Sequence, residues 1–292
     1  MSIITPVRFF LLFLLIPFCS IAQNFEFLGV IKLNDSSFIS YKLVFDRVKD
    51  SINGYSLTDF AGKHETKSNI KGFYNEEENI LTFKEYDIIY TKSTVVENDF
   101  CFVNFSGKLR NLDRAKAFSG DFKGLYSDGQ KCLDGMIIVN DAGRIAKRVE
   151  KIDRKIQRSR RFSDSIKENI SARKILDTLN RNIIAKGENL NIFSRDQEVK
   201  LKLYDAGKED GDRINLFVGG EKVLSDYTVT KEIKQIQIPL NSKSVTIRIE
   251  AINVGSSAPN TVRLEIEDSQ NFIRTLTNLD AGEKAEVTIL KK

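Results

Sequence analysis

The sequence lacks the motifs on which the common enzyme mechanisms depend. It contains a single histidine, His64, and no tryptophan. No Gly-x-Ser-x-Gly nucleophile motif, His-Glu-x-x-His zinc motif or Gly-x-x-x-x-Gly-Lys phosphate loop occurs. His64 lies in a polar segment without partners for catalysis or metal binding, which indicates a surface loop. The sequence therefore predicts a protein that is not an enzyme, although two converging carboxylates of a glycoside hydrolase would leave no such motif.

Long hydrophobic runs are also scarce, and the one that stands out lies at the start of the sequence. Arg8 precedes the apolar run Phe9–Ile16, which is too short to span a bilayer. Ser20 and Ala22 then supply the small residues of a cleavage site. We therefore expect a signal peptide over residues 1–22, cleavage after Ala22, a periplasmic or secreted mature protein, and no later transmembrane segment.

Cysteine is rare, with three residues in all. Cys19 would fit a lipoprotein signal only if a small residue preceded it, and Phe18 stands there. Cleavage would leave Cys101 and Cys132, both in strand-like runs. An even pair in an oxidising compartment predicts a disulfide, since no further cysteine or histidine accompanies them as metal ligands would require. Two buried free thiols are the alternative.

Residues 23–140 predict an antiparallel β module that curls into a barrel. Their apolar residues alternate with polar ones, as in Ile39, Tyr41, Leu43 and Phe45, which is the period of a half-buried strand. A unit of the form apolar-x-Gly-x-apolar also recurs. It occurs at Phe27–Ile31, Ile70–Tyr74, Phe105–Leu109, Phe118–Phe122, Phe122–Tyr126 and Leu133–Ile137. Glycine inside a strand marks a bend or a close approach of backbones, as at barrel corners.

On this strand pattern the module resembles a small lipocalin-type or calycin-type barrel, although it lacks the Gly-x-Trp signature of lipocalins. The resemblance implies ligand binding, but a barrel of this size can also be filled by its own side chains. Several aromatic residues would either line a pocket or form the core. We interpret them as core: Phe73, Tyr74, Phe83, Tyr86, Tyr90, Phe100 and Phe102.

Residues 141–190 form a basic segment with helical periodicity, and we interpret it as a linker. Ile145, Val149, Ile152 and Ile156 fall on one helical face, and Asp141 can cap the start. A break near Ser163 and a capping-box pattern from Ser165 predict a second helix. We expect a protease-sensitive, solvated connector between two independently folding halves. Export argues against nucleic acid as its partner, and anionic polysaccharide or lipid head groups are the alternative.

Residues 196–292 return to strict alternation, as in Val245, Ile247, Ile249 and Ala251. About seven short strands separated by turn residues are typical of a β-sandwich of the immunoglobulin-like class. The predicted fold is thus mainly β: an N-terminal barrel-like meander, a basic helical linker, and a C-terminal sandwich.

One loop of this sandwich concentrates negative charge. Asp205, Asp210 and Asp212 lie close together with two glycines between them. Carboxylates at this spacing repel each other unless water or a cation screens them. Two interpretations stay open: a solvated turn, or a Ca²⁺ site with these three aspartates as ligands and Asn260 as a further one.

The residues Asp205-x-Gly-x-x-Asp-Gly-Asp-x-Ile214, Ala251-x-Asn-x-Gly255 and Pro259-Asn-Thr261 resemble a small β-sandwich module that recurs in exported bacterial proteins, often at the C-terminus. The resemblance implies a binding or accessory role without catalysis. We therefore expect an exported, non-enzymatic protein that contacts a small ligand, a cell-surface polysaccharide or an envelope protein. The alternative is a structural, envelope-associated protein without a small ligand. A hollow barrel would favour the former, and a filled one the latter.

Overall fold

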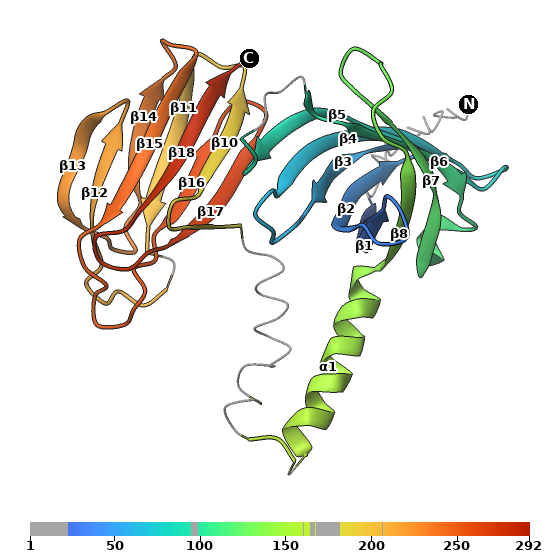
Figure 1. Ribbon diagram of the computed structural model, residues 1–292, viewed down its shortest axis with the longest axis horizontal. Helices are drawn as coiled ribbons and strands as arrows, with labels where there is room; N and C mark the ends of the chain where they lie inside the picture. Colours follow the sequence, from blue (N-terminus) through green and yellow to red (C-terminus); the bar gives the residue numbers. More distant parts are fainter. Residues whose placement is uncertain (1–22, 95–98, 160, 164–166, 168–181, 206) are drawn as a thin grey trace, which may run out of the picture.

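The computed structural model describes residues 23–94, 99–159, 161–163, 167, 182–205 and 207–292. It is a mainly β protein with two strand-rich parts, as predicted, and the described residues include one long helix (Figure 1). The expected signal peptide, and nearly all of the second helix expected from Ser165, lie outside these residues.

The N-terminal part is a closed barrel of eight antiparallel strands, which confirms the barrel prediction. Each strand pairs with the next along the chain, and β8 returns to pair with β1. The strands are β1 (Gln23–Lys32), β2 (Phe38–Val48), β3 (Ser51–Thr58), β4 (Thr66–Asn75), β5 (Ile80–Thr91), β6 (Phe102–Lys108), β7 (Ala117–Leu125) and β8 (Gly135–Asp141). A short 3-10 helix, η2 (Leu112–Arg114), connects β6 to β7.

Aromatic side chains fill the barrel interior. The Phe105 ring lies 5.2 Å from that of Phe83 and 5.5 Å from that of Phe118, which in turn lies 5.1 Å from Phe27. All four residues are buried, together with aliphatic side chains from the other strands. The interior is therefore occupied by the protein itself.

The glycines of the recurring unit mark close approaches, as expected. A Cβ atom added at Gly107 or Gly120 would lie 2.6 or 3.0 Å from the Phe105 ring. At Gly29 it would lie 2.0 Å from the carbonyl oxygen of Ile138 on the neighbouring strand. The missing side chains thus leave space for the interior rings and for tight strand pairing.

The core prediction is wrong at Phe73 and Tyr86, which are 50% and 46% exposed. Phe73 precedes the buried Tyr74, and Tyr86 follows the buried Glu85. Successive side chains of a strand point to opposite faces, so both rings lie on the outside of the barrel. Tyr74, Phe83, Tyr90 and Phe102 are buried as predicted.

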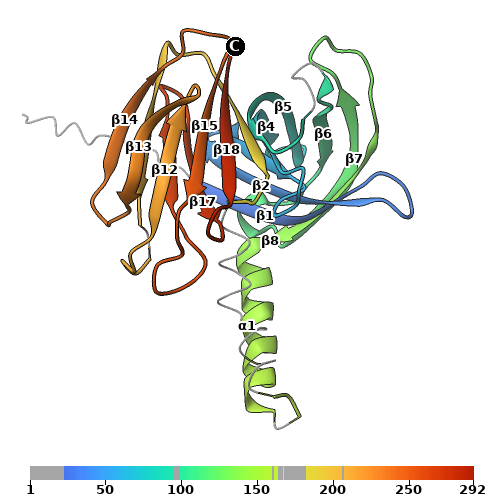
Figure 2. The same cartoon turned by 60° about the vertical axis from the view of Figure 1, so that its left-hand side comes forward.

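The C-terminal part consists of two strand layers on either side of one aliphatic core (Figures 1 and 2). The first layer has the order β13-β12-β15-β18-β10, and the second has the order β14-β11-β16-β17-β9. The strands are β9 (Ile183–Ala185), β10 (Asn189–Ser194), β11 (Glu198–Tyr204), β12 (Arg213–Val218), β13 (Glu221–Thr228), β14 (Lys234–Pro239), β15 (Ser244–Ala251), β16 (Arg263–Glu267), β17 (Phe272–Asn278) and β18 (Lys284–Lys291).

Strand β5 joins the two parts. Its first half closes the barrel against β6, and its end pairs with β10 at Tyr90 and Thr91, which creates one 13-stranded sheet. Ile89 and Tyr90 also pack into the aliphatic core of the C-terminal part. The two parts therefore share both a sheet and a hydrophobic core.

Helix α1 (Ala142–Arg158) follows β8 directly and projects from the barrel (Figure 1). The Asp141 side chain caps it by accepting a hydrogen bond from the Arg144 N–H at 2.8 Å, as predicted. All of its residues are at least partly exposed, and Ile152 is more than half exposed. Among the described helices, none has both the length and the apolar character needed to cross a membrane.

Candidate functional site

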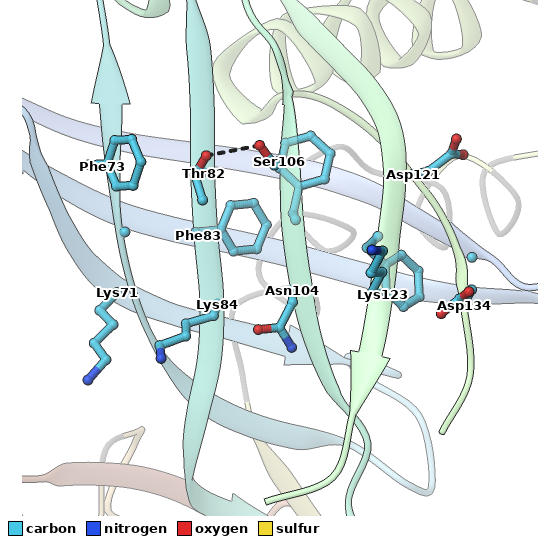
Figure 3. A pocket seen from close by; sticks show the side chains of 14 residues that line it. Lys71, Phe73, Thr82, Phe83, Lys84, Asn104, Ser106, Asp121, Lys123 and Asp134 are labelled. Atoms are coloured by element: carbon cyan, nitrogen blue, oxygen red, sulfur yellow. Dashed lines mark hydrogen bonds between the residues drawn. The ribbon is translucent and has the colours of Figure 1, made fainter. Parts of the chain in front are cut away.

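The outer wall of the barrel over β4, β5, β6 and β7 contains an open depression of about 1110 Å³ (Figure 3). Phe83, Phe105 and Phe122 lie beneath it, but their side chains are nearly inaccessible because they point into the barrel. The residues before and after each phenylalanine point outward instead. The exposed surface of the depression therefore consists of these neighbours, which are mostly polar.

Three lysines and one asparagine form a row across the depression. Strand register places Lys71 opposite Lys84, Lys84 opposite Asn104, and Asn104 opposite Lys123. The row therefore crosses four adjacent strands, with its members side by side in Figure 3. Like charges directly opposite each other in a sheet are destabilising, so Lys71 and Lys84 repel each other. The Lys71 ammonium lies 4.6 Å from the centre of the Tyr86 ring, which offsets part of this cost, and an anion over the pair would offset more.

A second row beside the first is uncharged over three strands. Register places Phe73 opposite Thr82 and Thr82 opposite Ser106, and the two hydroxyl oxygens lie 3.1 Å apart. This row therefore combines an exposed aromatic face with hydroxyl groups.

Acidic residues stand at the far side of the depression, on and beyond β7. Asp121 lies on β7, and Asp134 precedes β8. Lys131 Nζ contacts Asp134 at 2.8 Å, and this hydrogen bond is the main reason why the pKa of the Asp134 carboxyl is lowered. Because Asp134 already has a cationic partner, the three lysines of the row outnumber the remaining carboxylate, and the depression has a net positive character.

The lining residues offer charged, amide, hydroxyl and aromatic groups for binding. They include no histidine or cysteine, and the two hydroxyls pair with each other. His64, the only histidine of the sequence, is exposed as expected and lies 3.3 Å from the Ser93 hydroxyl. The chemistry available in the depression is thus attraction of anions, hydrogen bonding and aromatic contact.

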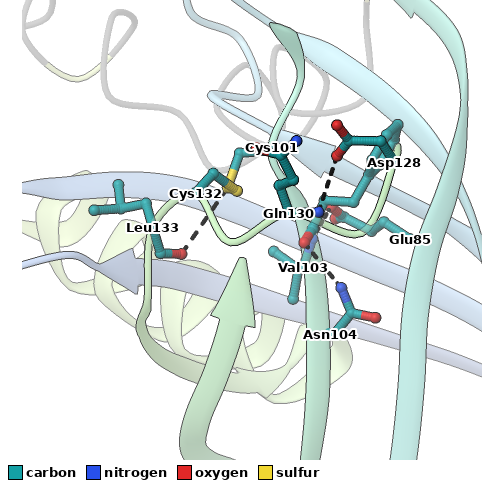
Figure 4. The surroundings of a disulfide bond; sticks show 9 residues. Glu85, Cys101, Val103, Asn104, Asp128, Gln130, Cys132 and Leu133 are labelled. Atoms are coloured by element: carbon teal, nitrogen blue, oxygen red, sulfur yellow. Dashed lines mark hydrogen bonds between the residues drawn. A yellow bond between two sulfur atoms is a disulfide. The ribbon is translucent and has the colours of Figure 1, made fainter. Parts of the chain in front are cut away.

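The structure confirms the disulfide between Cys101 and Cys132 (Figure 4). Its Cα atoms are 6.0 Å apart, and it joins the segment before β6 to the segment between β7 and β8. The Cys132 N–H also donates to the Gly124 carbonyl at 3.0 Å. The disulfide thus ties together strands that form one side of the depression, and its role is structural.

The three predicted metal ligands lie in the loop between β11 and β12. Asp205 and Asp212 are buried, and Asp210 is half-buried. Asp205 Oδ1 accepts the Gly207 N–H at 2.6 Å, and Asp212 Oδ2 accepts the Thr261 N–H at 2.8 Å. In the described ranges, no three or more His, Cys, Asp or Glu side chains are grouped to hold a metal ion.

Burial raises the pKa of the Asp212 carboxyl, and the neighbouring charges of Asp210 and Asp205 add to this effect against the Thr261 hydrogen bond. The charges of Asp205 and Asp210 therefore act on Asp212, in agreement with the crowding of carboxylates expected from the sequence. Metal binding by this loop stays a prediction.

Sequence reasoning missed the lysine row. Its members alternate with buried residues on their own strands, as on any strand with one solvent-exposed face. Only the pairing of β4 through β7 places them side by side, and the sequence contains no signal for that register.

No family model, curated protein or solved structure matches the chain. The resemblances to lipocalin-type barrels and to exported sandwich modules thus remain predictions.

Proposed function

We propose that this is an exported, non-enzymatic binding protein that attaches to anionic polysaccharide at the cell surface. Binding takes place on the outside of the barrel, in the depression over β4–β7. The observation that carries this proposal is the row of Lys71, Lys84 and Lys123 with Asn104 between them.

The filled interior supports an external site. Phe27, Phe83, Phe105 and Phe118 occupy the space in which a lipocalin-type barrel would hold its ligand. A ligand inside would have to displace rings that contact each other directly. We therefore do not propose a small apolar ligand in the barrel.

The row has the spacing of a repeating anion. Neighbouring strands lie about 4.8 Å apart, so the row spans roughly 14 Å from β4 to β7. A linear polysaccharide with one carboxylate per sugar can place several charges along such a distance. Phe73 beside the row offers a flat apolar face to a sugar ring. Exposed charges are screened by salt, so the binding is expected to weaken as ionic strength rises.

The C-terminal part fits an accessory role. We infer that it is an immunoglobulin-like sandwich module, because two strand layers enclose one aliphatic core. Its parallel pairs, β10 with β18 and β17 with β9, depart from a purely antiparallel arrangement. The second candidate function is a structural, envelope-associated protein without a ligand, which the filled barrel also favours.

Titration calorimetry on the mature chain tests the proposal, with polygalacturonate as the anionic probe and dextran as the neutral one. We expect salt-dependent binding of polygalacturonate alone. The variant Lys71→Ala/Lys84→Ala/Lys123→Ala should bind at least about tenfold more weakly, if each surface charge contributes about 0.5 kcal/mol.

A matched control removes three exposed lysines from helix α1: Lys147→Ala/Lys151→Ala/Lys155→Ala. It changes the net charge equally and should keep the wild-type affinity. Equal affinity of the row variant and wild type would overturn the proposal. Loss of binding in the helix variant alone would place the binding site on α1. Absence of polygalacturonate binding by the wild type would favour the structural role.

A further inference from the structure

Two loops of the C-terminal part hold buried oxygens without partners. Asp210 Oδ1, Asp212 Oδ1 and Asn260 Oδ1 are inaccessible and accept no hydrogen bond. The Asp212 and Asn260 residues are 2% and 0% exposed. Buried polar atoms in folded proteins nearly always have a partner, so three such acceptors in adjoining loops call for an explanation.

The orientation of Asn260 is fixed by its own amide nitrogen. Nδ2 donates to the carbonyl oxygens of Asn253 at 2.9 Å and Arg213 at 3.3 Å. The Asn260 N–H donates to the Leu279 carbonyl at 2.9 Å, which holds the backbone. Turning the side-chain amide over would lose both of its hydrogen bonds, so the unpartnered atom is an oxygen and requires a donor or a cation.

Asp212 lies next to Asn260 across the loop contact. Its Oδ2 accepts the N–H of Thr261, the residue after Asn260, at 2.8 Å. Asn260 Nδ2 in turn contacts the carbonyl of Arg213, the residue after Asp212. These reciprocal contacts hold the two side chains together, with Oδ1 of each left over.

Asp210 also contacts the loop that contains Asn260. Its carbonyl oxygen accepts the Ser256 N–H at 2.9 Å. Gly255 has a φ of +57°, and a Cβ atom there would lie 2.5 Å from Asp210 Oδ1. Only a glycine leaves space for this carboxylate. The effect of the Asp210 charge on the pKa of Asp212 agrees with this proximity.

We propose that a calcium ion binds between these loops, with Asp210 Oδ1, Asp212 Oδ1 and Asn260 Oδ1 as its side-chain ligands. All three are hard oxygen donors, and Ca²⁺ accepts mixed carboxylate, amide, carbonyl and water ligands in a flexible geometry. Zn²⁺ prefers nitrogen and sulfur, and Mg²⁺ demands a stricter octahedron.

This ligand set modifies the one expected from the sequence. Asp205 Oδ1 accepts the Gly207 N–H, and Asp205 has no buried oxygen without a partner, so it contributes its charge rather than a ligand oxygen. Only Asp210 and Asp212 contribute carboxylates and Asn260 contributes an amide oxygen, so the site does not require a group of three acidic side chains, which the described residues lack. Two charges predict weak affinity, with a Kd of about 10⁻⁴–10⁻³ M as in extracellular modules.

Thermal melts and calorimetry of the mature chain, freed of metal with EDTA, test the site with CaCl₂ and MgCl₂. At ten times the Kd, Ca²⁺ should raise the Tm by about 3–6 °C through mass action, and Mg²⁺ should raise it less. Asp210→Asn removes one ligand charge without changing the side-chain size and should abolish the rise.

Glu221→Gln is the matched control, since it neutralises an exposed carboxylate of the same part and should keep the full rise. Calorimetry of the wild type supplies a readout that does not depend on the folding of any variant. Absence of binding heat and of a Tm change up to 10 mM Ca²⁺ would overturn the proposal, as would an undiminished rise in Asp210→Asn.

Discussion

The barrel and the C-terminal part fill their interiors with different residues. The barrel core contains six phenylalanines, which are Phe27, Phe45, Phe83, Phe105, Phe118 and Phe122. Among the described residues, the buried core of the C-terminal part consists of Ile, Leu, Val and Ala with one aromatic residue, Tyr90, which comes from β5 of the barrel. The difference follows from geometry. A closed barrel surrounds a central space that only large side chains fill, whereas two layers about 10 Å apart are bridged by aliphatic ones.

The two parts also differ in whether their buried polar groups have hydrogen-bond partners. Glu85 is buried in the barrel, where its carboxylate accepts hydrogen bonds from Tyr41, Ser56 and the Val103 N–H. In the C-terminal part, Asp212 and Asn260 each keep an unpartnered oxygen. The protein itself satisfies Glu85, whereas the calcium ion proposed above would satisfy the free oxygens of Asp212 and Asn260.

The largest expected effect is the loss of an interior ring. Phe105→Ala should destabilise the protein by about 3–5 kcal/mol. The ring fills the space beside Gly107 and Gly120, and its removal would leave a cavity there because neither glycine has a side chain to fill it. Phe73→Ala makes the same chemical change on the outer face and should cost within about 0.5 kcal/mol. Urea unfolding measures both, and similar losses for the two variants would contradict a filled interior.

Removing the disulfide should lower the free energy of unfolding slightly less than Phe105→Ala does. Cys101→Ala/Cys132→Ala opens a loop with a sequence separation of 31 residues, which corresponds to about 3–4 kcal/mol on the chain-entropy estimate. Hydrogen exchange should show the loss in β6 and β7 before β15 and β18. Under reducing conditions wild type and variant should have equal stability, and a difference between them there would point to another cause.

Acid should weaken the junction between the two parts through Asp87. Burial alone would raise the pKa of this carboxyl, but hydrogen bonds from Arg195 and Lys292 lower it below its ordinary value of 3.8. A lowered pKa in the folded state means that the stabilisation is complete above about pH 5 and is lost as the pH falls through that pKa.

The test compares melts at pH 7 and pH 3. Asp87→Asn should be less stable than wild type at pH 7, and the gap should shrink at pH 3. A gap that stays constant would show that the charge of Asp87 does not stabilise the junction.

The smallest expected effect is that of cleaving the basic segment, residues 141–190. Trypsin should cut within residues 141–190, but the shared sheet and core at β5 and β10 should keep the two fragments together. Gel filtration at pH 7 after cleavage should give one peak. Two separate peaks would instead support independently folding halves.

The sequence predicted much of the fold, because period-2 alternation identifies strands and the positions of glycine indicate a curled sheet. The prediction failed at the end of β5, where this strand leaves the barrel and pairs with β10. Alternation holds from Leu81 to Glu85, and the run Ile88–Thr91 is then buried throughout. Ile89 and Tyr90 pack into the core of the C-terminal part, whereas Ile88 packs with Phe102 and Phe193. No local pattern separates such a run from an ordinary buried strand. The lysine row depended on pairing between strands and was not predictable, whereas the cysteine pair and the crowded aspartates were visible directly.

The central claim is that a filled barrel binds on its outer wall, and amide chemical shifts of the chain from residue 23 onward test it most directly. On titration with a galacturonate oligosaccharide, shift changes should concentrate at residues 71–73, 82–84, 104–106 and 121–123. Changes concentrated at interior positions such as Phe27 and Phe118, or along helix α1, would contradict the account.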